Sequence, residues 1–169
     1  MNKRTLVIAM GITVAFVAWY LFRPELLFVD ETVSETFPAE TGGPVTGAPT
    51  VLAQGRFHSV AHQSKGLATA YQFPDGKRVL RLTDFETSNG PAVYVYLVAV
   101  KDAVDSAAVR QADTIDLGPL KGNKGDQNYD LPADVDLAKF QAVSIWCRRF
   151  SVNFATAPLS VPSDSRSSR

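Results

Sequence analysis

The sequence predicts an all-β protein, with a single β-sandwich or barrel-like domain of about seven to nine short strands. Apolar and polar residues alternate over short stretches with a period of two, the period at which a strand places successive side chains on opposite faces. The 169 residues include ten prolines and eleven glycines, and turn signals such as Pro74-Asp75-Gly76 separate the alternating stretches. A hydrophobic content of 46% is sufficient for one ordinary domain with its own core.

The amino-terminal segment, residues 1–23, is predicted to be a transmembrane signal anchor. Residues 6–22 carry no charge, and this run lies at the short end of the ~17–25 residues that cross a bilayer as a helix. Because Lys3 and Arg4 precede the run, we expect a single-pass protein of the cell membrane whose carboxyl-terminal domain is extracytoplasmic. No small-residue cleavage site follows, which favours an uncleaved anchor over the alternative, a cleaved signal peptide.

Composition divides the rest of the chain into a linker, a domain and a tail. Residues 24–49 are first acidic and then rich in glycine and proline, as flexible linkers are. Residues 50–160 hold the predicted strands, and residues 161–169 are serine-rich and predicted to be disordered. We expect strands at residues 51–57, 67–73, 77–85, 92–100, 114–120 and 127–131, with one or two more between 143 and 159.

Two stretches of the domain depart from simple alternation. Residues 92–100 are apolar on both faces of the expected strand, so we place this strand at the centre of a sheet that is covered on both sides. Residues 102–112 instead predict one or two helical turns on the surface.

The only cysteine of the chain, Cys147, lies in a stretch whose strand pattern is irregular. Apolar residues occupy one face before Arg148-Arg149 and the opposite face after them: Val143, Ile145 and Cys147, then Phe150, Val152 and Phe154. A regular strand cannot bury both sets against one core. Either a bulge or tight turn at the arginines therefore shifts the alternation, or the strand is buried on both faces.

Cys147 is the first candidate for chemistry. A single cysteine cannot form a disulfide within a monomer, so its thiol is buried and inert, paired between chains, or functional. A functional Cys147 would be a redox thiol, or a ligand of haem iron or another metal, with its pKa lowered by a neighbouring arginine. In a regular strand Arg148 would point to the opposite face, and only Arg149 would share the side of the cysteine.

Other functional classes find little support in the sequence. His58 and His62 lie in a polar loop, and a zinc site would need both of them together with Cys147, so no metal site is predicted. The formal net charge is +0, so nucleic acid is not expected as a partner. No serine triad and no phosphate-binding Walker motif is present, and a stand-alone enzyme is not expected.

A series of motifs runs through the predicted domain in a fixed order. The motifs are Gly55-x-Phe57, His62, Gly66, Val79-Leu80-Arg81-Leu82-x-Asp84-Phe85, Asn89-Gly90-Pro91, Leu117-Gly118-x-Leu120-Lys121-Gly122-Asn123-x-Gly125-Asp126-Gln127-Asn128-Tyr129-x-Leu131-Pro132 and Ile145-Trp146-Cys147-x-Arg149-Phe150-Ser151-Val152-x-Phe154. With them, residues 52–159 resemble the DM-thirteen family of small extracellular β modules. The resemblance implies an electron-transfer module in which Cys147 is a free redox thiol or holds a group such as haem. It also implies His62 as a second cofactor-binding residue.

Two functional hypotheses follow. The first is a membrane-anchored redox module that passes electrons, or exchanges disulfides, with a partner through Cys147. The alternative is a non-catalytic binding or adhesion module that presents its loops to a surface protein or glycan and keeps Cys147 as a buried structural residue. A reactive thiol or a chromophore would favour the first hypothesis, and a thiol that reacts only in the unfolded protein would favour the second.

Overall fold

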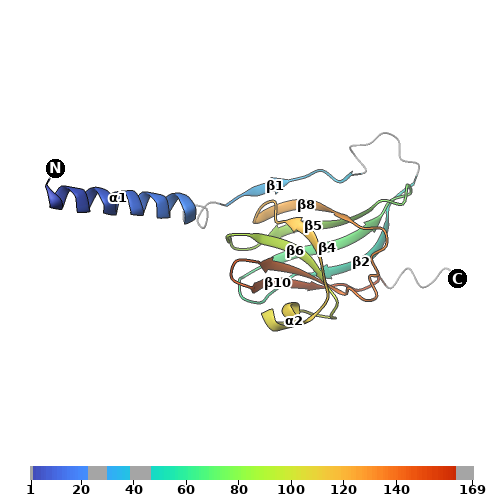
Figure 1. Cartoon of the computed structure of the whole chain (residues 1–169). Helices are drawn as coiled ribbons and strands as arrows, with labels where there is room; N and C mark the ends of the chain where they lie inside the picture. Colours follow the sequence, from blue (N-terminus) through green and yellow to red (C-terminus); the bar gives the residue numbers. More distant parts are fainter. Residues whose placement is uncertain (1, 23–29, 39–46, 163–169) are drawn as a thin grey trace.

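A computed structural model gives the fold and describes residues 2–22, 30–38 and 47–162. The described chain forms an amino-terminal helix, α1 (Lys3–Phe22), and a domain built almost wholly of strands (Figure 1). The prediction of an all-β domain is confirmed. Over the described ranges the strands form two separate sheets and no closed barrel, so the sandwich is the architecture observed.

Each sheet contains five strands. The first has the order β1-β8-β5-β4-β2, and its strands are β1 (Thr32–Ser34), β8 (Lys124–Leu131), β5 (Arg78–Glu86), β4 (Lys65–Gln72) and β2 (Thr50–Arg56). The second has the order β3-β10-β9-β6-β7, and its strands are β3 (His58–Ser59), β10 (Val152–Pro158), β9 (Ala142–Cys147), β6 (Val93–Val98) and β7 (Thr114–Pro119). Neighbouring strands are antiparallel except β1 and β8, which run parallel.

The main core lies between the two sheets and is filled by inward side chains from both. In the first sheet Leu80 of β5 lies opposite Tyr129 of β8, and in the second Val95 of β6 lies opposite Ile145 of β9. None of these four side chains is more than 4% exposed. Burial of a large apolar side chain contributes about 1.5–3 kcal/mol, so this interior is the main source of the domain's stability.

A smaller apolar cluster covers the outer face of the second sheet. The helix α2 (Ser106–Gln111) begins after Asp105, whose side chain accepts a hydrogen bond from a backbone N–H of the first turn. Val109 of this helix packs with Trp146 of β9. The second sheet is therefore covered on both faces at β6 and β9. This confirms the predicted coverage of residues 92–100 on both faces, although the middle strand of the sheet is β9 and not β6. The surface helix forms where helical turns were predicted.

The helix α1 presents large apolar side chains to solvent along its length, among them Ile8, Phe16 and Trp19, which are all more than half exposed. No helix in the described part of the chain is long and apolar enough to span a membrane. The transmembrane helix predicted over residues 6–22 is therefore not supported. The prediction relied on an apolar run at the lower limit of the length that spans a bilayer.

Part of the predicted linker belongs to the sandwich. β1 pairs with β8 at the edge of the first sheet, and the ring of Phe37 packs edge-on against Tyr71 with 5.0 Å between the ring centroids. The carboxylate of Glu35 accepts hydrogen bonds from Lys121 Nζ at 2.7 Å and from the backbone N–H of Asn128 at 2.6 Å. Residues 24–29 and 39–46 of the predicted linker, and the predicted tail beyond residue 162, lie outside the described residues.

Candidate functional site

The side chain of Cys147 points into the main core at the end of β9. It is 0% exposed, and its neighbours across the sheet are Val93 of β6 and Val152 of β10. All six residues of β9 are buried, because the first sheet covers one face and the α2 segment covers the other. Both alternatives predicted for this stretch occur together: β9 is buried on both faces, and a tight turn follows it before β10 begins.

A loop from a distant part of the sequence lies over the thiol. We call residues 89–92 the covering loop. The thiol of Cys147 donates a hydrogen bond to the backbone carbonyl of Pro91 over 3.2 Å, and the backbone N–H of Arg148 donates to the carbonyl of Ala92 at 3.0 Å. Ala92 has a φ of 63°, a left-handed conformation that costs about 1–2 kcal/mol for a residue other than glycine. The end of β9 therefore holds the covering loop in a strained conformation over the thiol.

A surface cavity of about 390 Å³ adjoins the covering loop. Its lining includes Gly90 and Ala92, on either side of Pro91, together with Tyr94 and Leu120, but it does not include Cys147. The covering loop therefore lies between the thiol and this cavity. A reagent or partner in this cavity would reach the sulfur only after the loop had moved.

His62 lies near the covering loop but does not contact the thiol directly. Its ring stacks on the ring of Phe154 with 3.8 Å between the centroids. The far edge of the Phe154 ring packs against Gly90, where an added Cβ would lie 2.8 Å from the ring. The described contacts thus connect His62 to the covering loop only through Phe154. His58 is engaged elsewhere, with Nε2 3.0 Å from the carboxylate of Asp102.

The residues at this site do not fit a haem. The sulfur of Cys147 is enclosed by core side chains and is hydrogen bonded to Pro91, and it does not line the two neighbouring cavities of about 390 and 580 Å³. The ring of His62 packs against the Phe154 ring at an interplanar angle of 37°, and no described contact brings it to the thiol. The described residues also contain no group of three or more His, Cys, Asp or Glu side chains that could hold a metal ion. The thiol itself is the redox-capable group that the structure offers.

Arg148 lies on the opposite face of β9 from the thiol, as the alternation of a strand predicts. Its guanidinium carbon lies 3.5 Å from the centre of the Tyr94 ring, and its Nε donates to the hydroxyl of Tyr96 at 2.6 Å. Asp116 of β7 forms an ion pair with the same guanidinium. The hydrogen bond with Tyr96 and then the charge of Asp116 raise the pKa of Arg148. The positive charge of Arg148 is therefore paired within this outer cluster, on the side of the sheet away from the thiol.

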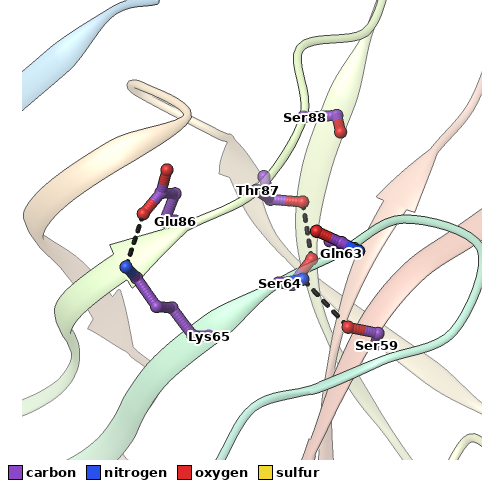
Figure 2. Close-up of a pocket in the computed structure, with 7 residues that line it drawn as sticks. All are labelled: Ser59, Gln63, Ser64, Lys65, Glu86, Thr87 and Ser88. Atoms are coloured by element: carbon purple, nitrogen blue, oxygen red, sulfur yellow. Dashed lines mark hydrogen bonds and ion pairs between the residues drawn. The ribbon is translucent and has the colours of Figure 1, made fainter.

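A second cavity, of about 580 Å³, lies beside the first and shares Ser88 with it. Figure 2 shows its lining, in which Lys65 and Glu86 form an ion pair at 2.7 Å and the hydroxyls of Ser64 and Thr87 are 2.8 Å apart. The hydrogen bond from Lys65 holds the pKa of Glu86 below its usual value. Glu86 is therefore a carboxylate at neutral pH.

These features define a class of protein: a small two-sheet β module with one thiol enclosed at the end of a central strand. Comparison with protein families identifies the family. Residues 56–159 match the family described as "Electron transfer DM13". Because the match covers more than half of the chain, the protein belongs to this family. Neither the curated proteins nor the solved structures contain a match to this chain.

Sequence reasoning identified Cys147 but missed the residues that determine its accessibility. The resemblance to the family included Asn89-Gly90-Pro91 as a motif, yet the motif by itself gives no sign that it lies over the thiol. The contact between Pro91 and Cys147 spans 56 positions, and no local pattern signals it. The cluster around Arg148 was missed for the same reason, since only the strand register places Tyr94 and Tyr96 beside it.

Proposed function

We propose that this protein is an electron-transfer module and that Cys147 is its redox group. Membership of the electron-transfer family over residues 56–159 carries the proposal. The sequence contains no other cysteine, and the burial of Cys147 protects its sulfur from unselective oxidation by solvent species.

A single thiol can carry two electrons between partner proteins as a mixed disulfide. The Cys147 thiol loses its proton to solvent, and the thiolate attacks a disulfide of the oxidised partner, which forms a mixed disulfide and releases the partner's other sulfur as a thiolate. A thiolate of a reduced dithiol partner then attacks this mixed disulfide and releases the first partner. The second thiolate of the dithiol partner closes a disulfide within that partner and restores the Cys147 thiolate. Each of these steps requires the covering loop to open.

We also propose that the module works on the extracytoplasmic side of the cell membrane, held there by α1. Lys3 and Arg4 precede the apolar run, and the large apolar side chains of α1 are exposed and available to a lipid surface. Fractionation of cells that express the full chain tests this part of the proposal. We expect the protein in the membrane fraction and its domain open to protease added outside the cytoplasm; a protein found only in the cytosol would contradict it.

Mixed-disulfide formation tests the redox role. The reduced full chain is incubated with glutathione disulfide under native conditions, and the modified fraction is followed by mass spectrometry with circular dichroism as a check on folding. We expect modification of Cys147 in the folded protein and none in Cys147→Ala. Pro91→Gly loosens the covering loop and should speed the reaction several-fold. The matched change Pro74→Gly, in the turn between β4 and β5, should leave the rate unchanged.

A second function, a binding module with an inert cysteine, is favoured by the complete burial of Cys147. This function predicts that the thiol reacts only as fast as the whole protein unfolds and that Pro91→Gly does not change the rate beyond its effect on global stability. That outcome would reject the redox role.

A further inference from the structure

The cavity of about 390 Å³ beside the covering loop reaches the strand position next to the thiol. Val93 of β6 lines this cavity and is also the cross-strand neighbour of Cys147. Side chains directly opposite each other in an antiparallel pair lie on the same face, with Cβ atoms about 4.5–5.5 Å apart. A group held in the cavity is therefore separated from the sulfur by the Val93 side chain and by the Pro91 carbonyl of the covering loop.

One part of the cavity lining is apolar. It consists of Val93 and Leu120, whose backbones are joined by a hydrogen bond from the Leu120 N–H to the Val93 carbonyl at 2.9 Å, together with Pro119 and Tyr94. Val93 belongs to the main core and Leu120 packs against it, so this lining is an open margin of the protein interior. An apolar side chain of a bound segment would leave water here, which is the dominant favourable contribution in most protein association.

The charged part of the lining is acidic and is held by a buried amide. Asp30 and Glu31 line the cavity just before β1, the edge strand beside β8 in Figure 1. Asn123 is 3% exposed; its side chain accepts from the backbone N–H of Glu31 at 2.7 Å and donates to the carboxylate of Asp30 at 2.8 Å. Lys124 neutralises Asp30 through an ion pair at 2.6 Å. The Glu31 carboxylate makes no hydrogen bond or ion pair with any other residue in the described ranges, so it is the charge that a ligand can meet.

The same amide connects this acidic lining to the covering loop. The Asn123 side chain also donates to the carbonyl of Thr87 at 3.1 Å, and the Thr87 N–H donates to the carbonyl of Asn123 at 2.9 Å. Thr87 lies two positions before the covering loop, and Gly90 and Ala92 of the loop line the cavity themselves. Because Ala92 is held in a left-handed conformation, a ligand that displaces this residue relieves backbone strain and favours the open loop.

We infer that this cavity is the docking site for the segment of the redox partner protein that carries its disulfide, and that this segment has a basic and a large apolar residue beside its cysteine. The inference rests on the proposed function. The apolar residue packs on Leu120 and the basic residue pairs with Glu31, which leaves the partner's disulfide next to the covering loop. Anionic disulfides such as glutathione disulfide bring carboxylates toward Glu31, so they react more slowly than the basic segment.

A set of matched disulfide peptides tests the docking site. Each short capped peptide has one Lys and one Leu beside a cysteine that is joined to nitrothiobenzoate as a mixed disulfide. The Cys147 thiolate attacks the peptide sulfur, forms a protein–peptide disulfide and releases the coloured nitrothiobenzoate anion, so absorbance gives the rate and mass spectrometry identifies the adduct. With the full chain we expect this peptide to react about ten-fold faster than peptides in which Glu replaces Lys or Ser replaces Leu.

Two charge reversals in the protein provide the matched comparison. Glu31→Lys should slow the Lys peptide about five-fold and should speed the Glu peptide. Asp134→Lys reverses an exposed charge beyond the opposite end of β8 and should change either rate by less than about two-fold. Equal effects of the two substitutions would overturn the inference, because the rates would then follow only the total charge.

Binding without chemistry separates the docking site from the redox role. Cys147→Ala is titrated with a fluorescent form of the Lys peptide in which Ser replaces the cysteine, and we expect binding that Glu31→Lys weakens. If this peptide binds but wild type forms no adduct with any disulfide, the redox role fails and the docking site stands. If glutathione disulfide and all the peptides react with Cys147 at one rate, the redox role stands and the docking site fails.

Discussion

Replacement of Cys147 by alanine should lower the free energy of unfolding by about 1–2 kcal/mol and leave the fold intact. The side chain is 0% exposed and belongs to the main core, so the change removes one buried heavy atom and leaves a small space between the sheets. Loss of the transfer free energy of a group of this size costs about 0.8 kcal/mol. A residual cavity of roughly 25 Å³ adds about 0.6 kcal/mol at the usual cost per unit of volume.

The hydrogen bond to Pro91 adds little to this sum, because a thiol is a weak donor and the distance is 3.2 Å. Cys147→Ser gives a matched comparison. The hydroxyl prefers water to an apolar core, so we expect serine to destabilise the protein more than alanine does, by about 1–3 kcal/mol relative to alanine.

Urea denaturation of the full chain, followed by circular dichroism, measures both variants. The urea concentration at the unfolding midpoint should fall in the order wild type, alanine, serine. The slope of the unfolding free energy against urea concentration should be the same for all three. A serine variant as stable as wild type would refute the reasoning, because it would mean that a hydrogen bond to the Pro91 carbonyl, or to water, fully offsets the burial of the hydroxyl. An alanine variant destabilised by more than about 4 kcal/mol would show that Cys147 has a larger structural role than its contacts account for.

Two further predictions concern the segment before β2. Gly125 has a φ of 97°, and a Cβ there would overlap the carbonyl of Val33. We therefore expect Gly125→Ala to release β1 and to raise amide hydrogen exchange over residues 32–34, while the core strands stay protected. Unchanged exchange at β1 would contradict this prediction. Burial raises the pKa of Glu35, but the hydrogen bonds from Lys121 and from the Asn128 N–H outweigh it and hold this pKa below its ordinary 4.5. The carboxylate therefore stabilises the fold above pH 4.5, and this contribution is lost as the pH falls through the lower pKa of the folded state. We expect Glu35→Gln to lower the free energy of unfolding by about 1 kcal/mol at pH 7 and to make its fall at acid pH less steep. An equally steep fall in the variant would refute the role of Glu35.

The strands and their boundaries were largely predictable because the signals are local. Alternation with a period of two, and turn residues such as Pro74-Asp75-Gly76, operate within a few positions of the chain. The strand over residues 92–100 was placed at a sheet centre from composition alone; β6 is an interior strand between β9 and the edge strand β7, and the middle of the sheet is β9. The transmembrane helix was the prediction that the structure did not support.

The candidate site was predictable only in its central residue. Cys147 was identifiable as the single thiol and through the family motif, and His62 was proposed beside it. The structure places His62 against Phe154 and not against the thiol. Loop positions such as residue 62 have no periodicity, so the sequence carries no signal for the direction in which their side chains point.

By itself, then, the sequence determined the all-β class, the order of the strands along the chain and the residue that carries the thiol, because patterning and composition express these properties locally. The tertiary structure alone decided that residues 32–34 join the first sheet, that Pro91 covers Cys147 and that Tyr94 and Tyr96 hold Arg148. The Pro91–Cys147 contact and the Arg148–Tyr96 contact join residues 56 and 52 positions apart. Such contacts follow from cross-strand register and from the packing of one sheet on the other, and these depend on the whole chain at once.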